Sequence, residues 1–316
     1  MPDAPTPVLA IDIGGTKIAG GVVHGPTVAH PAQAPTPSRQ GAGAVVDAAW
    51  RVARSALDAH VAAGGARPTA LAVASAGVVD PAGGTILAAT DAIRDWTGTA
   101  LRDELAQRAG LPVHVLNDVQ AHALGEYRHG RGVGHPSMLL VAAGTGIGGG
   151  LVVDGRLVLG AGNLAGHVGH VDVTAADQVP CSCGRQGHVE AIASGTGIEQ
   201  HFTRRTGEHR TGAEIAALAG TDDPHATAAR LVIETAGHAL GRAIGGLLNA
   251  LDPGLVVLAG SVPRAGERWW DTLRAGVRDS AMPVVADTPV VPAALANAAL
   301  VGAACWAAPT EREEPR

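Results

Sequence analysis

The sequence has few aromatic side chains, few cysteines and no run of basic residues. Aromatic residues make up 2% of the 316 residues, so we expect an apolar core of Ala, Val, Leu and Ile. A formal net charge of −6 without a basic stretch disfavours nucleic-acid binding, which needs cations to neutralise phosphates. No apolar run reaches membrane-spanning length, and residues 1–7 lack a basic segment followed by an apolar stretch. We therefore expect a cytoplasmic protein that binds neither nucleic acid nor membranes.

The remaining composition is that of a folded α/β protein with two lobes. Hydrophobic residues make up 46% of the chain and charged residues 16%, which supports well-buried sheets and disfavours disorder. A length of 316 residues exceeds most single cores and suits two lobes of ordinary domain size. Two lobes would provide a cleft for a small-molecule substrate.

A glycine pair interrupts the first apolar stretch. Val8–Ile13 and Ile18–Val23 are rich in β-branched residues, so we expect a hairpin that turns at the glycines. Glycines bring backbone N–H groups close to an anion. Beside them, Thr16 has a hydroxyl, Lys17 is a cation, and Asp12 has a carboxylate suited to Mg²⁺. From this segment alone a phosphate site and an ordinary hairpin turn are equally good interpretations; its residues are Asp12, Gly14, Gly15, Thr16 and Lys17.

A second glycine-rich segment, Gly144–Gly150, follows the apolar stretch Ser137–Ala143. Its spacing fits G-x-G-x-x-G, but a dinucleotide-binding loop must open a helix, whereas residues 151–155 indicate a strand and a tight turn. The sequence contains no Walker pattern G-x-x-x-x-G-K-[ST]. Two glycine turns in separate halves predict instead that a nucleotide's phosphates are clamped between two lobes.

Asn117 and Asp118 lie where the predicted strand Val113–Leu116 meets a predicted helix that reaches about Tyr127. Both residue types are common helix caps, and from this pair alone the cap is the better interpretation. The alternative is that Asp118 is a catalytic carboxylate. Two cysteines, Cys181 and Cys183, form a C-x-C pair among three cysteines, and this odd count favours a metal site over a disulfide.

Taken in order, these motifs resemble those of the ROK family of sugar kinases and related repressors, over almost the whole chain. The two glycine loops and Asn117-Asp118 each match a family motif. Further matching segments are Ala76–Asp80, Ala165–His170, Cys181–Glu190 and Leu258–Ser261.

The resemblance implies a two-lobed, actin-like (ribonuclease H-like) ATPase fold. We expect residues 1–115 to form a small lobe that a C-terminal helix at about 293–308 completes, and residues 116–292 to form a large lobe. Asp118 would be the catalytic base that accepts the proton of the sugar hydroxyl. The predicted substrate-binding residues are Gly77, Asn117, Asp118, His167, His170 and Glu190. The predicted ATP- and Mg²⁺-binding residues are Asp12, Gly14, Gly15, Thr16, Lys17, Gly144, Thr145, Gly146 and Gly260.

The resemblance also implies a structural Zn²⁺ site at His170, Cys181, Cys183 and His188. The family usually has a third cysteine where this chain has His188, but histidine is an ordinary zinc ligand. The alternative is that His188 faces solvent and the cysteines are reduced thiols. A bound metal would fix an irregular loop and aim His167 and Glu190 at the sugar.

The identity of the sugar depends on His167. Glucose-phosphorylating members usually have a glutamate there, and the sequence around His167 looks like that of bacterial N-acetylmannosamine kinases. A neutral imidazole offers one donor and one acceptor, which suits an amide substituent. We expect an N-acetylmannosamine kinase that acts on the 6-hydroxyl; the alternative is a glucokinase of the same family.

Two other classes of protein share the fold. The family's repressors carry a helix-turn-helix domain before the first phosphate loop, and the start of that loop at Asp12 disfavours this reading. A non-catalytic sugar-sensing regulator is disfavoured by the intact Asp12, Lys17, Asn117 and Asp118. A homodimer is expected from the resemblance only.

Overall fold

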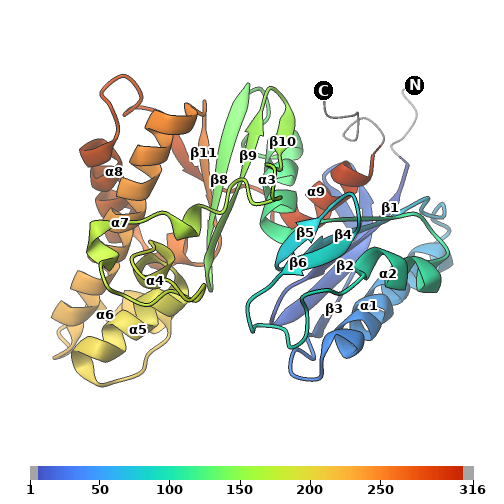
Figure 1. Cartoon of the computed structure of the whole chain (residues 1–316), viewed down its shortest axis with the longest axis horizontal. Coiled ribbons are helices and arrows are strands. Elements are labelled where there is room, and N and C mark those ends of the chain that lie inside the picture. Colours follow the sequence, from blue (N-terminus) through green and yellow to red (C-terminus); the bar gives the residue numbers. More distant parts are fainter. Residues whose placement is uncertain (1–5, 309–316) are drawn as a thin grey trace. The chain divides into compact units, whose positions relative to one another are not determined.

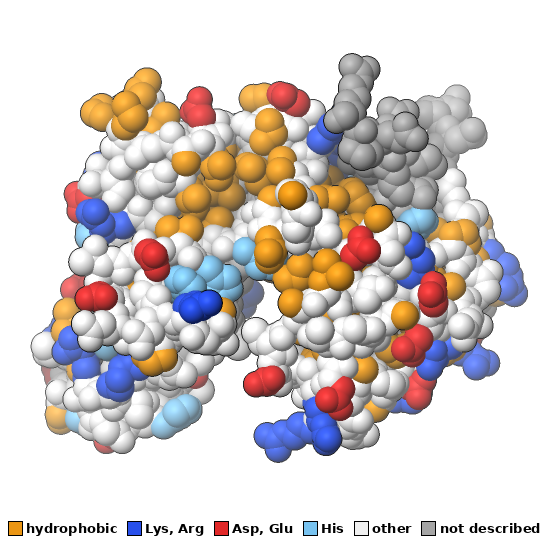
Figure 2. Space-filling view, in the orientation of Figure 1, with side chains coloured by type: hydrophobic (Ala, Val, Ile, Leu, Met, Phe, Trp, Pro, Cys, Tyr) orange, Lys and Arg blue, Asp and Glu red, His pale blue; other side chains and the backbone are white. Residues whose placement is uncertain are grey.

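The computed structural model describes residues 6–308, which form two compact units (Figure 1). The first unit comprises the chain up to Gly134, Gly150–Ala165 and the chain from Ala294 onward; the second comprises His135–Gly149 and Gly166–Ala293. Among the helices of residues 6–308, none combines the length and apolarity that a membrane-spanning segment needs. On the face that Figure 2 shows, acidic and basic side chains are scattered among polar and apolar ones.

The first unit is built on a five-stranded sheet of order β3-β2-β1-β4-β7. Its first three strands form an antiparallel meander, and β4 and β7 continue the sheet parallel to β1. The strands are β1 (Val8–Ile13), β2 (Lys17–His24), β3 (Thr27–Pro35), β4 (Leu71–Ser75) and β7 (Val113–Asn117). The predicted hairpin at the first glycine pair is confirmed. A separate two-stranded sheet joins β5 (Val78–Asp80) to β6 (Thr85–Ala88).

Helices cover both faces of this sheet. Leu9, Ile11 and Ile13 alternate along β1 and pack in a core with α1 (Ala42–Ala62) and α2 (Leu101–Ala109). Ala10 belongs to the core on the opposite face, which α9 (Ala298–Ala307) covers. Because both faces of the sheet are covered, four of the six residues of β1 are buried and the other two, Val8 and Asp12, are half-buried.

Helices α3 (Asp118–His129) and α9 pack backbone against backbone. A Cβ atom at Gly125 would collide with the carbonyl of Ala298, and one at Gly302 with the carbonyl of Ala121. This contact groups α3 with the first unit, which therefore extends past residue 115, where we expected the small lobe to end. The division into small and large functional lobes stays a prediction.

The last helix begins later than residue 293. Residues 293–297 are not helical, and the backbone N–H groups of Ala294 and Leu295 donate to Glu126 Oε1, at 2.8 and 2.6 Å. Glu126 is fully buried on α3, and these bonds offset part of the free-energy cost of removing its carboxylate from water. The sequence pattern predicts a helix from about residue 293, but the carboxylate of Glu126 holds the residues before Ala298 in a non-helical conformation.

The second unit repeats the sheet plan of the first. Its sheet has the order β10-β9-β8-β11-β12, again an antiparallel meander followed by two parallel strands, although residues 150–153 of β9 and all of β10 group with the first unit. The strands are β8 (Ser137–Ala143), β9 (Ile147–Val153), β10 (Arg156–Val158), β11 (Val256–Ala259) and β12 (Val290–Pro292).

Five α-helices of the second unit are described, with short 3-10 turns at Val168–His170, Thr174–Ala176 and Val262–Ala265. The helices are α4 (Glu190–Ala193), α5 (Gly195–Thr206), α6 (Gly212–Leu218), α7 (Ala226–Leu251) and α8 (Glu267–Ser280). Helices α7 and α8 pack closely because Gly237, Gly241 and Gly245 recur every four residues on α7 and leave room for the α8 backbone.

Candidate functional site

The first glycine turn joins β1 to β2 in the first unit. The backbone N–H of Gly14 donates to the Lys17 carbonyl at 3.0 Å, and Thr36 Oγ1 donates to the Gly14 carbonyl at 2.7 Å. Thr16 and Lys17 are exposed, whereas Asp12 on β1 is half-buried. The turn therefore presents a hydroxyl, an ammonium group and glycine backbone together, which is the arrangement predicted for a phosphate site.

Asp12 lies in the same sheet as the residues around Asp118. Strands β1, β4 and β7 are parallel neighbours, and Asp12 pairs in register with Ala74, which pairs with Leu116. The pKa of Asp12 is raised to about 7, chiefly by burial and next by the negative charge of Asp118, although the charge of Lys17 lowers it. The charge of Asp118 thus acts on Asp12 near the carboxyl ends of parallel strands.

Asn117 is the N-cap of α3 and also orients Asp118. Its Oδ1 accepts the backbone N–H groups of Val119 and Gln120 at 3.1 and 3.0 Å, which confirms the cap interpretation for this residue. Its Nδ2 donates to the Gly77 carbonyl at 2.8 Å and to Asp118 Oδ1 at 2.9 Å. Both amide protons of Asn117 are therefore used inside the protein, and its predicted contact with a sugar hydroxyl stays a prediction.

Asp118 opens α3 beside this cap and is itself half-buried. Its Oδ1 also accepts the backbone N–H of Val119 at 2.9 Å. Burial raises the pKa of Asp118 to about 6, although hydrogen bonds from Val119 and Asn117 lower it. A carboxylate with a pKa near neutrality, fixed by two hydrogen bonds, has the properties of a general base.

Gly77 fixes the carbonyl that Asn117 contacts. Its φ of 95° lies in the left-handed region, and a Cβ atom would lie 2.7 Å from the Ala88 carbonyl oxygen. Glycine is required here for both reasons. The structure thus brings Gly77, Asn117 and Asp118 together, with Gly77 acting through its backbone.

The second glycine loop, Gly144–Gly150, turns between β8 and β9. The Gly144 N–H donates to the Gly146 carbonyl at 2.9 Å, which closes the turn. Gly260 lies against it, because a Cβ atom there would collide with the Ala143 carbonyl. The predicted residues Gly144, Thr145, Gly146 and Gly260 are thus neighbours within the second unit.

Helix α5 adds two residues to this loop that the sequence analysis missed. The backbone N–H of Gly195 donates to the Gly144 carbonyl at 2.7 Å, and that of Thr196 to the Thr145 carbonyl at 3.4 Å. The available signal was Ser194, whose hydroxyl accepts the Gly197 N–H at 3.0 Å and caps α5. The start of α5 therefore supports the glycine loop.

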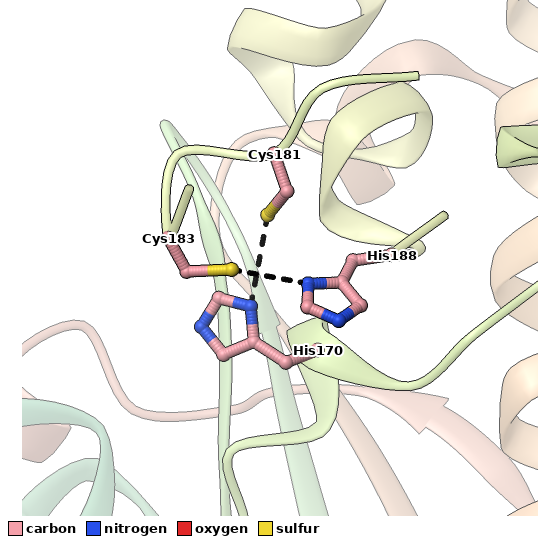
Figure 3. A group of neighbouring side chains, drawn as sticks. All are labelled: His170, Cys181, Cys183 and His188. Carbon is pink, nitrogen blue, oxygen red and sulfur yellow. Dashed lines mark hydrogen bonds between the residues drawn. The ribbon is translucent and has the colours of Figure 1, made fainter. Parts of the chain in front are cut away.

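His170, Cys181, Cys183 and His188 converge in the second unit (Figure 3). Their ligand atoms all lie within 4.8 Å of one another; Cys181 Sγ is 3.7 Å from His170 Nδ1, and Cys183 Sγ is 3.2 Å from His188 Nδ1. Ligand atoms of a tetrahedral zinc site with Zn–S and Zn–N bonds of ordinary length lie about 3.3–3.8 Å apart. The donor set fits zinc, and His188 points into the cluster and not to solvent.

Two oxygens of Glu190 join this cluster's loop to the second glycine loop. Glu190 opens α4; its Oε1 accepts the Ser182 hydroxyl at 2.5 Å and its Oε2 accepts the Ile147 N–H at 2.8 Å. His167 immediately precedes the 3-10 turn Val168–His170, so it shares a short turn with His170. His167, His170 and Glu190 belong to the second unit, whereas Gly77, Asn117 and Asp118 belong to the first.

Comparison with known proteins identifies the family of this chain. The sequence model described as the ROK family matches residues 8–310. The glucokinase of Halalkalibacterium halodurans is 35% identical over 206 residues, which are 61% of this chain and 62% of that protein, less than two thirds of its length. The N-acetylmannosamine kinase of Yersinia pseudotuberculosis is 33% identical over 301 residues, which are 95% of this chain and 97% of that protein.

A solved structure extends the likeness to the fold. The crystal structure of a ROK family glucokinase from Streptomyces griseus in complex with glucose and AMPPNP has a TM-score of 0.78 and 30% sequence identity. The likeness covers 95% of this chain and 98% of that chain. The predicted α/β, actin-like fold is thereby confirmed.

Proposed function

Because the chain belongs to the ROK family, we propose that it is an ATP-dependent sugar kinase and that Asp118 is its catalytic base. The observation that carries the proposal is the environment of Asp118. Asn117 and the α3 backbone hold this carboxylate in one orientation, and burial brings its pKa to about 6. Such a base is ionised at neutral pH and still basic enough to accept a proton during the reaction.

In the proposed reaction, Asp118 accepts the proton of a sugar hydroxyl as that oxygen bonds to the γ-phosphorus of ATP. The bond from this phosphorus to the bridging oxygen breaks, and ADP leaves with that electron pair. Bound Mg²⁺ supplies charge neutralisation at the phosphates, and Asp12 is the residue proposed to hold it through water. The chain itself contributes orientation: strand β1 fixes Asp12, and hydrogen bonds from Asn117 and Val119 at the start of α3 fix Asp118.

Backbone groups of the two glycine loops are proposed to contact the phosphates. In the first unit these are Gly14, Gly15 and Thr16, with Lys17 as the cation. In the second unit they are Gly144, Thr145 and Gly146, with Gly260 near the adenosine. The intact hydrogen-bonded geometry of both turns supports this assignment.

We propose N-acetylmannosamine as the sugar and its 6-hydroxyl as the acceptor. The support is His167, which stands where glucose-phosphorylating members usually have a glutamate, beside the sugar-binding residues proposed at His170 and Glu190. A glucokinase is the second candidate, because relatives of both names match at similar identity, 35% and 33%. A sugar-sensing regulator without activity is the alternative from another class.

His170, Cys181, Cys183 and His188 are proposed to hold a structural Zn²⁺. Bound zinc would stabilise a loop that has little apolar core of its own. A homodimer and a cytoplasmic location also stay predictions.

The test is a coupled assay of ADP release with Mg²⁺-ATP and a panel of glucose, mannose, N-acetylmannosamine, N-acetylglucosamine, allose and fructose. We expect the highest kcat/KM with N-acetylmannosamine. A kcat/KM for glucose at least about tenfold above all others would assign a glucokinase instead. Turnover with none of the sugars, in protein that binds them, would favour the regulator.

A further inference from the structure

Glu190 contacts two loops that the proposed function treats as separate. These are the metal loop, which we define as residues 181–188, and the second glycine loop, Gly144–Gly150. We infer that Ser182 and Glu190 couple the two, so that occupancy of the metal site sets the geometry of the nucleotide-binding loop. The inference rests on the proposed function, and it assigns Ser182 as a positioning residue for nucleotide binding.

The coupling consists of hydrogen bonds to both carboxylate oxygens, and Cys181 Sγ also lies 3.8 Å from Oε1. Ser182 Oγ donates to Oε1 at 2.5 Å, and the Ile147 N–H donates to Oε2 at 2.8 Å. Because the carboxylate is planar, a bond at one oxygen fixes the direction in which the other accepts. Bonds to an ionised acceptor are also about twice as strong as neutral ones.

The backbone of Glu190 is also fixed by contacts outside the two loops. Residues Ala191, Ile192 and Ala193 of α4 are buried, and the Val189 N–H donates to the Val171 carbonyl at 2.9 Å. Only rotation of the Glu190 side chain is therefore left for Ser182 to restrain. A Cβ atom at Gly146 would lie 2.8 Å from Glu190 Oε2, so the carboxylate packs directly on the loop backbone.

Ser182 is placed by its neighbours in the sequence. It stands between Cys181 and Cys183, so a metal held by both sulfurs fixes the Ser182 backbone from each side. The turn is exposed, and its backbone bonds are at its base: the Gly184 N–H donates to the Cys181 carbonyl at 3.0 Å, and the Cys181 N–H donates to the Arg185 carbonyl at 2.8 Å. Loss of the metal would release Ser182, and with it the orientation of Glu190.

Glu190 restrains the half of the glycine loop that α5 does not reach. The α5 backbone bonds end at Gly144 and Thr145, whereas Glu190 bonds Ile147 on the other side of the turn. Removal of the Ser182 hydroxyl is therefore expected to loosen this loop without unfolding it. We expect an effect of about three- to tenfold on nucleotide affinity, which is less than the full contribution of a hydrogen bond to a charged group, because Ser182 acts on the nucleotide only through Glu190.

The experiment compares Ser182→Ala with Ser182→Thr, which keeps a hydroxyl. Metal content is measured by elemental analysis, and the Kd of AMPPNP with Mg²⁺ by calorimetry, before and after removal of the structural metal by a chelator. We expect Ser182→Ala to retain one metal ion per chain and to bind AMPPNP about three- to tenfold more weakly. Ser182→Thr should bind as the wild type does.

Chelation should weaken AMPPNP binding in the wild type by at least the same factor and should have a smaller effect in Ser182→Ala, because both changes act through one link. The inference would be overturned if Ser182→Ala bound AMPPNP with wild-type affinity or lost the metal. It would also be overturned if the effects of chelation and of Ser182→Ala on AMPPNP affinity simply multiplied.

Hydrogen exchange separates this inference from the proposed function. Amides of residues 144–150 should exchange faster in Ser182→Ala than in the wild type or Ser182→Thr, whether or not any sugar is phosphorylated. If the sugar panel shows no turnover but exchange at Ile147 responds in this way, the link stands and the kinase assignment fails. If exchange of residues 144–150 is unchanged in Ser182→Ala while the protein phosphorylates a sugar, the kinase assignment stands and the inferred link fails.

Discussion

The negative charge of Asp118 raises the pKa of Asp12, although Asp12 lies on β1 and Asp118 follows β7, two strands that β4 separates in the sheet. The pKa is about 7 for Asp12 and about 6 for Asp118, and burial is the largest cause for both. Paired acids whose pKa values are raised in this way are typical of catalytic sites.

Asp118→Asn should abolish turnover but leave sugar binding nearly unchanged. The amide has the shape of the carboxylate but cannot accept the proton, so we expect kcat to fall at least about 100-fold. Sugar affinity, measured by calorimetry, should change less than about threefold. The exposed Asp103→Asn on α2 is the matched control and should retain full activity. Residual activity above about one per cent of the wild type would mean that another group is the base.

Below neutral pH, kcat/KM should fall steeply as the pH is lowered. Raised pKa values mean that both acids are protonated as pH falls, Asp12 near 7 and Asp118 near 6, whereas solvent-exposed aspartates would stay ionised to about pH 4. The base and the proposed Mg²⁺-binding carboxylate both need to be ionised. We therefore expect log kcat/KM, measured between pH 5 and pH 8, to fall with a slope approaching two. A flat profile down to pH 5 would contradict the proposed roles.

Asp12→Asn should stabilise the protein without ligands in alkaline more than in acid solution. The pKa of Asp12 is about 7 in the folded chain and 3.8 as its ordinary value, so the native state binds the proton more tightly. The stability gained from that proton is fully present below pH 4 and is lost as pH rises through 7. The increase in Tm of the variant over the wild type should therefore be larger at pH 8 than at pH 5. An increase that does not depend on pH would show that Asp12 is not perturbed.

His188 should be replaceable by cysteine but not by alanine. His188→Ala removes one of four converging ligands, and we expect metal affinity in a chelator competition to fall at least about 10- to 100-fold. His188→Cys supplies a thiolate from the same position and should retain the metal. The exposed His209→Ala serves as the control and should bind metal as the wild type does. Equal affinity in His188→Ala and the wild type would exclude His188 as a ligand.

Gly302→Ala should destabilise the first unit. The added Cβ atom would collide with the Ala121 carbonyl, and such overpacking costs about 1–3 kcal/mol in free energy of unfolding. Gly246→Ala on α7 is the matched control, because its Cβ atom would meet nothing within 4 Å. That change should stabilise its helix by about 0.5–1 kcal/mol, since alanine is the better helix former. Denaturant unfolding of both variants measures the difference; a Gly302→Ala variant as stable as the wild type would mean that α3 and α9 separate at little cost.

Local patterns predicted the elements that carry the candidate site. Glycine pairs next to β-branched runs indicated both turns, and the C-x-C pair indicated a metal site, because each depends on residues close in sequence. The set of four metal ligands came from the family resemblance. The role of Asn117 as cap followed from its place between strand and helix. What sequence could not provide was the second use of its amide group, because Gly77 lies 40 residues away.

Long-range contacts account for the differences. The start of α9 at Ala298 depends on Glu126, which is 168 residues from Ala294. The grouping of α3 with the first unit depends on the fit of Gly125 and Gly302, which no periodicity indicates. The two contacts of Glu190 likewise join segments 43 and 8 residues away. Each of these is a backbone or carboxylate contact that leaves no pattern in the chain.

The packing of α9 on α3 also orders events during synthesis. The core that contains Ala10 of β1 includes residues up to Ala307. We therefore expect this core to form only after α9 has been synthesised. By contrast, most of the second unit is the nearly continuous stretch Gly166–Ala293 and is complete before α9 leaves the ribosome. Domains generally fold as units as they emerge, so we expect the middle of the chain to fold first and the N-terminal sheet last. The helix that begins with Asp118 would then be among the last parts of the nascent protein to become rigid.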